Sequence, residues 1–390
     1  MEAVPQYRLL VLAGFFPEST GGGVVLRGIL ADYPAELLLW YNVCTGRAAE
    51  TWWRPQVTRR GTRWYLPGKR FSVVRRLWAS VGYKVEAVIA AHGAAQEAAR
   101  FRPDVCWAVL DHHALFAIRD FARASRVPLH VSIHDDPAIA SRLLNTGISP
   151  RALENALVEC LRRARSRDCI SARMAAYYRS RYGVDCAVLT RGIDLDTLRQ
   201  EAPHWGNGTV NIALAGAPSP GDHSVEALLL ALDQLQTQWG VRTALHVFGG
   251  NGAPREHPRV YPHPPLTDVQ FATTMRTMHL GFASDPQTEI GRQFAATSFP
   301  TKVVTYLGFG LPFVYIGPGE STVRDLLNSY GAGVLVESQN PSMIAAAVGQ
   351  VLARYEEMQR ECRRAAVEQF DIRKVRDRAL RAILQEADQL

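Results

Sequence analysis

Lys302 is the cation whose place in the sequence most suggests chemistry. It follows the segment SFPT at 298–301 and opens an apolar run that ends at Gly308 and Gly310. This order predicts a short buried helix with a lysine in its first turn, followed by a strand. The N-terminus of a helix presents backbone N–H groups that favour an anion. Lys302 would add a positive charge at this helix start.

A second candidate is the sequence His134-Asp135-Asp136, which ends the predicted strand PLHVSIHD. An imidazole at the end of a strand can donate to a sugar hydroxyl or stabilise developing charge. The alternative is structural, with a carboxylate that caps the next helix beside a hydrogen-bonded histidine. A metal site is less favoured, because no further ligands cluster nearby in the sequence. The first two interpretations both remain open.

A run of three glycines, Gly21, Gly22 and Gly23, follows the strand YRLLVLAGF and opens a predicted helix. Glycine would let the backbone approach a ligand closely, and the helix N-terminus would favour an anion. The run could equally be a plain flexible turn. It does not match the GxGxxG pattern of dinucleotide-binding folds.

The elements that must position these residues alternate between strand and helix along the 390 residues. This alternation predicts parallel sheets with helices on both faces and a ligand crevice at the carboxyl ends of the strands. The pattern is interrupted at 194–209, which we interpret as a linker between two domains. We find no run of 18 apolar residues and therefore expect no membrane-spanning helix. The six cysteines show no metal-site spacing, which is typical of free thiols in a reducing cytoplasm.

The net charge of +7 is concentrated in one stretch. Residues 51–85 contain nine Lys or Arg residues, no Asp or Glu, and several aromatic side chains. We expect an amphipathic segment on an anionic membrane surface. A solvated charged face and a nucleic-acid patch are the alternatives. The predicted membrane or acceptor contacts are Trp52, Trp53, Arg70, Phe71, Arg75, Arg76 and Trp78.

Taken together, these segments resemble a GT-B glycosyltransferase, most of all the GT4 family of nucleotide-sugar-dependent enzymes. The segment GGGVVLRGIL is similar to the family's glycine-rich first loop, and VSIHD to its strand with a donor-contacting histidine. The most specific match is SFPTKVVTYLGFGLPFVYIGPGE, which resembles the FPSK-type variant of the donor-binding segment. The resemblance covers nearly the whole chain.

The resemblance implies an α/β protein of the GT-B class, with two doubly wound Rossmann-like domains facing a central cleft. We expect an N-terminal acceptor-binding domain at 1–195, a C-terminal nucleotide-sugar-binding domain at 196–372, and a helix at 373–390 that returns to the N-terminal domain. The implied reaction moves a hexose-type sugar from a nucleotide-sugar donor to a glycan or lipid-linked acceptor. We expect it to need no metal or other cofactor and to run at the inner face of the cell membrane. No nucleic-acid partner is expected.

The resemblance also implies roles for single residues. Lys302 would neutralise the donor diphosphate as its glycosidic bond breaks, and His134, with Asp135, would act at the transferred sugar. The implied donor-binding residues are Gly22, Gly23, Gly216, Phe248, Gly249, Gly250, Ser298, Phe299, Pro300, Thr301, Thr305 and Glu320.

Two departures from the family pattern affect the expected chemistry. The positions of the family's paired glutamates are occupied by Thr297 and Thr305, and the loop AGAPSPGDHS lacks the usual basic residue. Retention of the anomeric configuration, typical of GT4 enzymes, is therefore left open. A nucleotide-sugar 2-epimerase of the same fold and a non-catalytic sugar-nucleotide or membrane-binding subunit are the alternatives.

Overall fold

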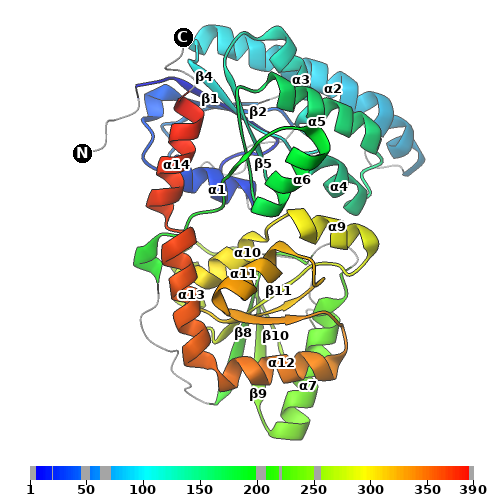
Figure 1. Cartoon of the computed structure of the whole chain (residues 1–390), viewed down its shortest axis with the longest axis vertical. Coiled ribbons are helices and arrows are strands. Elements are labelled where there is room, and N and C mark those ends of the chain that lie inside the picture. The colour runs from blue at the N-terminus through cyan, green and yellow to red at the C-terminus, as the bar shows by residue number, and fades with distance from the viewer. Residues whose placement is uncertain are drawn as a thin grey trace. The chain divides into compact units, whose positions relative to one another are not determined.

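The structure is a computed structural model that describes residues 6–19, 21–44, 53–61, 72–198, 208–218, 222–249 and 256–385, without the side chains of 72–83 and 197. The chain divides into two compact units (Figure 1). Unit 1 comprises Met1–Arg191 and Lys374–Leu390, and unit 2 comprises Gly192–Arg373. The boundaries expected from the sequence were 195/196 and 372/373.

The sheet of unit 1 has seven parallel strands among the described residues, in the order β3-β2-β1-β4-β5-β6-β7. The strands are β1 (Leu9–Ala13), β2 (Leu38–Asn42), β3 (Thr58–Gly61), β4 (Val105–Val109), β5 (Leu129–Ile133), β6 (Ser166–Cys169) and β7 (Ala187–Val188). The helices are α1 (Gly22–Ile29), α2 (Ser72–Phe101), α3 (Leu115–Ala124), α4 (Pro137–Leu143), α5 (Pro150–Arg163), α6 (Ala172–Tyr182) and α14 (Ile372–Leu384).

Unit 2 has six parallel strands among its described residues, in the order β10-β9-β8-β11-β12-β13. The strands are β8 (Thr209–Ala215), β9 (Arg242–Phe248), β10 (Val260–His263), β11 (Leu280–Ser284), β12 (Phe313–Ile316) and β13 (Gly333–Val336). The helices are α7 (Ser224–Trp239), α8 (Asp268–Met275), α9 (Glu289–Thr297), α10 (Thr301–Gly308), α11 (Thr322–Tyr330), α12 (Pro341–Ala353) and α13 (Tyr355–Gln369).

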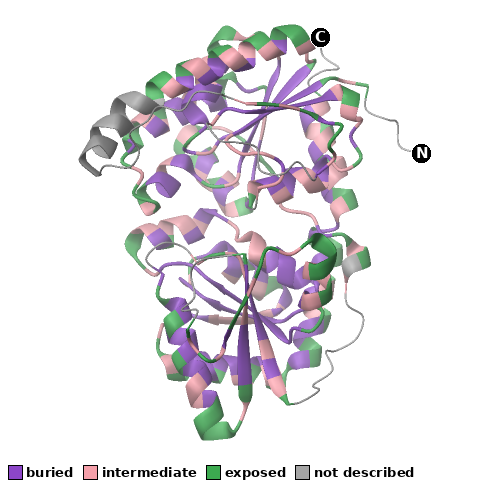
Figure 2. Cartoon of the chain, turned by 180° about the vertical axis from the view of Figure 1, so that it is seen from behind, coloured by how far each residue is buried: buried purple, intermediate pink, exposed green. Residues whose placement is uncertain are grey.

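The central strands form because their sequences are continuous apolar runs, such as LLVLA in β1 and VCWAV in β4, in which every residue is buried. Helices cover both faces of such a parallel sheet, so its strands need no polar face. Figure 2 shows the strands mostly buried, with exposed residues on the outer faces of the helices. The last helix, α14, packs Val375, Ala379 and Ile383 into the core of unit 1.

Each sheet has one point at which its strand order reverses. In unit 1 this switch point lies between β1 and β4, and in unit 2 it lies between β8 and β11. Loops that leave the carboxyl ends of these two neighbouring strands run in opposite directions, so a crevice opens there, and ligands of open α/β sheets bind in it. The switch points therefore define where each unit can hold a ligand.

Candidate functional site

Lys302 reaches the switch point of unit 2. It lies in the first turn of α10, whose N-cap residue, Pro300, offers no side-chain cap. The Lys302 Nζ donates to the carbonyl oxygen of Ala217 at 3.1 Å, two residues beyond the end of β8. Burial lowers the pKa of Lys302, and the nearby carboxylates of Asp285 and Asp222 act in the opposite direction. The ammonium group is thus held at the end of β8 beside the uncapped helix N-terminus.

Two buried carboxylates lie near Lys302 at this switch point. Asp222 accepts hydrogen bonds from the N–H of Ser224 at 3.0 Å and from the hydroxyl of Ser284 at 2.5 Å. Asp285 directly follows β11 and accepts from the hydroxyl of Tyr315 at 2.7 Å. Neither aspartate was predicted from the sequence. The position of Asp285 at the end of an apolar strand was the signal that could have revealed it.

The two threonines at the expected glutamate positions turn back to their own helices. Thr297 Oγ1 donates to the carbonyls of Gln293 and Phe294 at 3.4 and 3.3 Å, and Thr305 Oγ1 donates to that of Thr301 at 3.3 Å. Neither position supplies a carboxylate, as the sequence indicated.

Ser298 differs from these threonines because its hydroxyl is buried and has no hydrogen-bond partner. Its carbonyl oxygen accepts from Thr322 Oγ1 at 2.5 Å, which fixes the residue immediately before α10. A buried polar atom without a partner is rare in native structures and calls for an explanation. A bound ligand at the start of α10 would supply the missing partner.

Tyr306 separates the ends of β8 and β11. Their pairing stops at Gly281↔Ala213, and beyond it the Tyr306 hydroxyl donates to the carbonyl of Phe282 at 2.5 Å and accepts from the N–H of Ala215 at 3.1 Å. Gly281 is required for this arrangement, because a Cβ there would collide with the tyrosine ring. The donor-like segment therefore shapes the switch point through this side chain as well as through Lys302.

The other predicted donor residues of unit 2 lie around the same edge of the sheet. Gly216 has φ +87° and donates its N–H to the carbonyl of Phe248 at 2.7 Å. The Phe248 ring stacks on His263, with centroids 4.4 Å apart. Phe299 is half-buried and packs on Phe370 at 5.9 Å between ring centroids. Glu320 is exposed and lines a cavity of about 680 Å³. Gly249 has φ +64°, and Gly250 lies outside the described residues.

In unit 1 the glycine loop and His134 come together. The His134 Nδ1 lies 3.3 Å from the position that a Cβ on Gly22 would occupy, and the Phe15 ring lies 2.6 Å from it. A side chain at Gly22 would therefore displace one of these rings. Burial lowers the pKa of His134, which keeps the imidazole neutral, and its Nε2 is buried without a hydrogen-bond partner.

The capping interpretation holds for Asp136 and not for His134. Asp136 Oδ1 accepts from the N–H groups of Ala138 and Ile139 at 3.0 and 2.9 Å, and its Oδ2 accepts from the Tyr178 hydroxyl at 3.0 Å. Asp135 is exposed. The sequence left the two interpretations open. The structure shows the capping carboxylate at Asp136, and the role of His134 at a sugar stays a prediction.

The loop after β1 is fixed by side chains from outside it. Trp40 Nε1 donates to the carbonyl of Phe15 at 2.9 Å, and Arg27 donates to that of Ser19 at 3.1 Å. Glu18 forms a buried ion pair with Arg59 of β3 at 3.0 Å. Gly23 packs against the carbonyl of Pro17, 2.9 Å from the position of a Cβ. The described part of this loop, residues 14–19, is therefore held by side chains from α1, β2 and β3.

The segment Asp111-His112-His113, which follows β4 at the switch point of unit 1, was also not predicted from the sequence. Asp111 accepts from the backbone N–H groups of Gly14, His113 and Ala114, the latter two at 2.8 Å, and so ties the end of β1 to the end of β4. Burial lowers the pKa of His112 to about 4, and its Nε2 is buried without a partner. The letters DHH immediately after an apolar strand were the available signal.

One predicted membrane contact, Trp53, is contradicted by its burial. It is 8% exposed, packs on Trp40 with ring centroids 6.2 Å apart, and belongs to the core of unit 1. Arg54 and Arg59 lie 5.6 and 6.0 Å from its ring centroid. Its ring is therefore not available to a membrane. The other predicted contacts, Trp52, Arg70, Phe71 and the side chains of Arg75, Arg76 and Trp78, lie outside the described part of the chain.

Two further features were looked for among the described residues: membrane-spanning helices and groups of metal ligands. No described helix combines the length and the apolar character needed to cross a membrane. Over the same residues, no three His, Cys, Asp or Glu side chains are grouped so that they could hold a metal ion.

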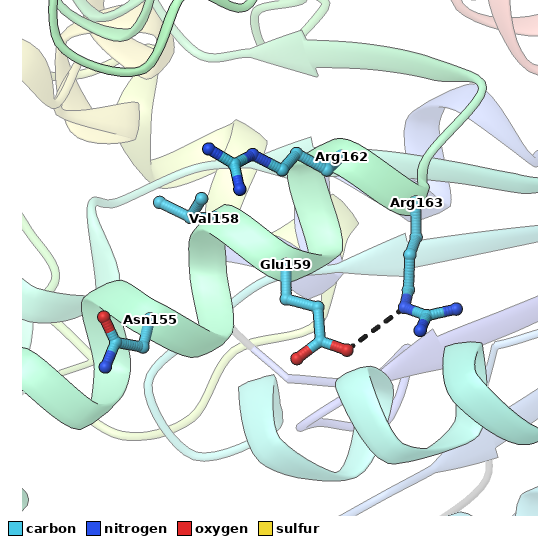
Figure 3. Close-up of a pocket in the computed structure, with 5 residues that line it drawn as sticks. All are labelled: Asn155, Val158, Glu159, Arg162 and Arg163. Carbon is cyan, nitrogen blue, oxygen red and sulfur yellow. Dashed lines mark hydrogen bonds and ion pairs between the residues drawn. The ribbon is translucent and has the colours of Figure 1, made fainter.

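A separate hollow of about 610 Å³ lies on α5 (Figure 3). Its side chains all come from this one helix, and Glu159 turns back to accept from Arg163 Nε at 3.1 Å. The arginines stand in the last turn of α5, at the amino ends of the strands, where cations stabilise the helix dipole. This hollow is therefore not part of the switch-point site.

The fold resembles those of several solved structures. Sucrose-phosphate synthase from Thermosynechococcus elongatus superposes with a TM-score of 0.71 at 10% identity, covering 98% of this chain and 100% of that one. The HepE protein of Anabaena in complex with UDP-glucose gives 0.65 at 15% identity, with coverages of 98% and 100%. A Listeria monocytogenes protein assigned as a UDP-N-acetylglucosamine 2-epimerase gives 0.57 at 13% identity, with coverages of 98% and 97%.

No protein-family model matches the sequence, and no curated protein sequence is detectably similar to it. The structural matches nevertheless extend over nearly the whole chain. Together with the two parallel sheets, they confirm the predicted fold class, a GT-B architecture with two doubly wound Rossmann-like domains.

Proposed function

We propose that this protein is a metal-independent glycosyltransferase that moves a hexose-type sugar from a nucleotide-sugar donor to a glycan or lipid-linked acceptor. The observation that carries the proposal is the Lys302 ammonium group at the end of β8, beside the uncapped N-terminus of α10. A cation beside a helix N-terminus at a switch point suits a diphosphate. The UDP-glucose bound to the structurally similar HepE supports the choice of donor.

In this proposal, the bond between the donor's anomeric carbon and its phosphate oxygen breaks, and the electron pair passes to the diphosphate. Lys302 and the first amides of α10 stabilise that charge, which is the interaction that strengthens as the bond breaks. The acceptor hydroxyl oxygen bonds to the anomeric carbon, and its proton leaves with the departing phosphate or to solvent. The neutral His134 holds a sugar hydroxyl through its unpartnered Nε2.

Two other functions have some support. The likeness to the Listeria protein favours a nucleotide-sugar 2-epimerase. The absence of carboxylates at Thr297 and Thr305 favours a non-catalytic sugar-nucleotide-binding subunit. Incubation with donor alone identifies the first, because only an epimerase returns an altered nucleotide sugar. Absence of turnover by the wild type with any acceptor, despite nucleotide binding, identifies the second.

We further propose that the acceptor is presented at the inner face of the cell membrane. The support is the sequence of 51–85, which has nine cations and no acidic residue. Co-sedimentation with anionic vesicles at low salt tests this, because electrostatic attraction is strongest there. Absence of binding at low salt would remove the membrane proposal and leave the transferase proposal intact.

Substitution of Lys302 tests the central proposal. Lys302→Ala should weaken binding of UDP about ten- to a hundredfold, because a charge-assisted hydrogen bond contributes about 1.5–3 kcal/mol. Turnover should fall further, by about 10²–10³-fold, because the charge on the leaving group grows in the transition state. Lys374→Ala, on an exposed position of α14, is the matched control. Equal UDP affinities of the Lys302 variant and the control would refute the proposal.

A further inference from the structure

A cavity of about 680 Å³ lies entirely within unit 2. One wall is a single face of α9, formed by Glu289, Arg292, Gln293 and Ala296, whose spacing follows the helical repeat. The volume is within the range of about 300–1,000 Å³ typical of small-molecule sites. Because α9 continues directly into the segment 298–301, the cavity wall and the proposed phosphate site are consecutive parts of unit 2.

The opposite wall is formed by residues that follow strands β12 and β13 in the sequence. Arg324 of α11 pairs with Glu337 at 3.1 Å, and both line the cavity together with Glu320. Glu337 can approach because Gly319 has no side chain, since a Cβ there would collide with its carboxylate. Both side chains of the pair are partly exposed, at 42% and 55%, and they border the cavity on this side.

The lining chemistry excludes some ligands and favours one class. Three carboxylates stand against two guanidinium groups and two side-chain amides, and no aromatic side chain takes part. This net negative charge disfavours a diphosphate. The Nε2 of Gln287, which also lines the cavity, is buried and has no hydrogen-bond partner. A sugar ring fits such a wall, because its neighbouring hydroxyls donate to carboxylates and accept from guanidinium and amide N–H groups.

We propose that this cavity binds one neutral hexose unit. The choice of a hexose rests on the proposed transferase function, but the binding itself does not require catalysis. The hexose has two possible sources, the sugar of the donor or a sugar of the acceptor glycan. Both would present ring hydroxyl groups to the wall.

Two substitutions test the cavity by different means. Ala296→Leu adds bulk to the wall without changing its charge, and Glu337→Gln keeps the shape but breaks the pair with Arg324. The matched control for the first is Ala353→Leu, at an exposed position of α12. The melting temperature of each variant is measured first, so that a folding defect is recognised.

Titration calorimetry is then performed with UDP, with a panel of UDP-hexoses and with a panel of methyl hexosides. If the donor sugar binds here, both cavity variants bind a UDP-hexose at least about tenfold more weakly, with UDP itself unchanged. If an acceptor sugar binds here, the loss falls on a methyl hexoside and the UDP-hexoses are unchanged.

A failure of this proposal is distinguishable from a failure of the proposed function. If both cavity variants bind every ligand as tightly as the wild type and the control do, the cavity is not a sugar site. The same conclusion follows if the wild type binds no methyl hexoside and binds UDP-hexoses no more tightly or weakly than UDP. If UDP and UDP-hexoses fail to bind the wild type while a methyl hexoside binds through the cavity, the nucleotide-sugar function is wrong and the sugar site stands.

Discussion

The buried imidazole of His112 predicts a specific pH dependence of stability. Burial holds its pKa at about 4 in the folded chain, against 6.5 for an ordinary histidine. Between these values the unfolded chain binds a proton that the folded chain excludes. Stability is therefore fully present above pH 6.5 and is lost as the pH falls toward 4. The whole loss amounts to about 3 kcal/mol, and about 2 kcal/mol of it falls between pH 7 and pH 5.

Substitution of His112 should remove its contribution to the loss of stability at low pH. In His112→Gln, the free energy of unfolding should fall by about 2 kcal/mol less between pH 7 and pH 5 than it does in the wild type. Any effect of glutamine itself at pH 7 cancels, because only the change with pH is compared. Groups distant from His112 that titrate in this range also cancel, since they are common to both proteins.

Urea unfolding at pH 7 and pH 5 measures the difference, followed by tryptophan fluorescence that includes the buried Trp40 and Trp107 of unit 1. His92→Gln, on the exposed side of α2, controls for the loss of a histidine as such. If His112→Gln and the wild type lose the same free energy between the two pH values, burial does not hold the His112 imidazole neutral and the predicted linkage is refuted.

Two further predictions concern the architecture around the switch points. Tyr306→Phe leaves the carbonyl of Phe282 and the N–H of Ala215 unpaired, so the free energy of unfolding should fall by about 2–4 kcal/mol, and an unchanged melting temperature would contradict the bridging role. Arg59→Met leaves the buried carboxylate of Glu18 without its ion-pair partner, so the free energy of unfolding should fall by about 3–5 kcal/mol. Adding Glu18→Gln should restore part of that free energy. A double variant as unstable as Arg59→Met alone would show that the ion pair is not responsible.

Part of the fold and site could be predicted because the relevant signals are local. A parallel strand that is covered on both faces is a continuous apolar run, so it can be recognised from its own sequence without knowledge of the strands beside it. Lys302 is equally visible, since it stands alone in an apolar segment at a helix start. His134 was found for the same reason, at the end of an apolar strand.

The rest depends on contacts between distant parts of the sequence. Trp53 and Arg59 belong to a basic and aromatic stretch that is typical of an exposed surface, but the side chain of Arg59 is buried in its pair with Glu18, 41 residues away. The nearby residues carry no sign of this partner. Asp111 and Asp285 were missed because an acidic residue after a strand usually begins a solvated loop, and only the strand order shows that both lie at switch points.

The two units repeat one arrangement with different charges. In each, a hydrogen-bonded aspartate follows the fourth strand at the switch point, Asp111 in unit 1 and Asp285 in unit 2. Unit 2 adds the ammonium group of Lys302, whereas the described part of unit 1 adds the neutral imidazoles of His112 and His134. An anion is favoured only where a cation accompanies the carboxylates, and hydroxyl groups suit neutral imidazoles. Under the proposed function, this charge pattern favours a diphosphate at the switch point of unit 2 and a neutral ligand with hydroxyl groups at the switch point of unit 1.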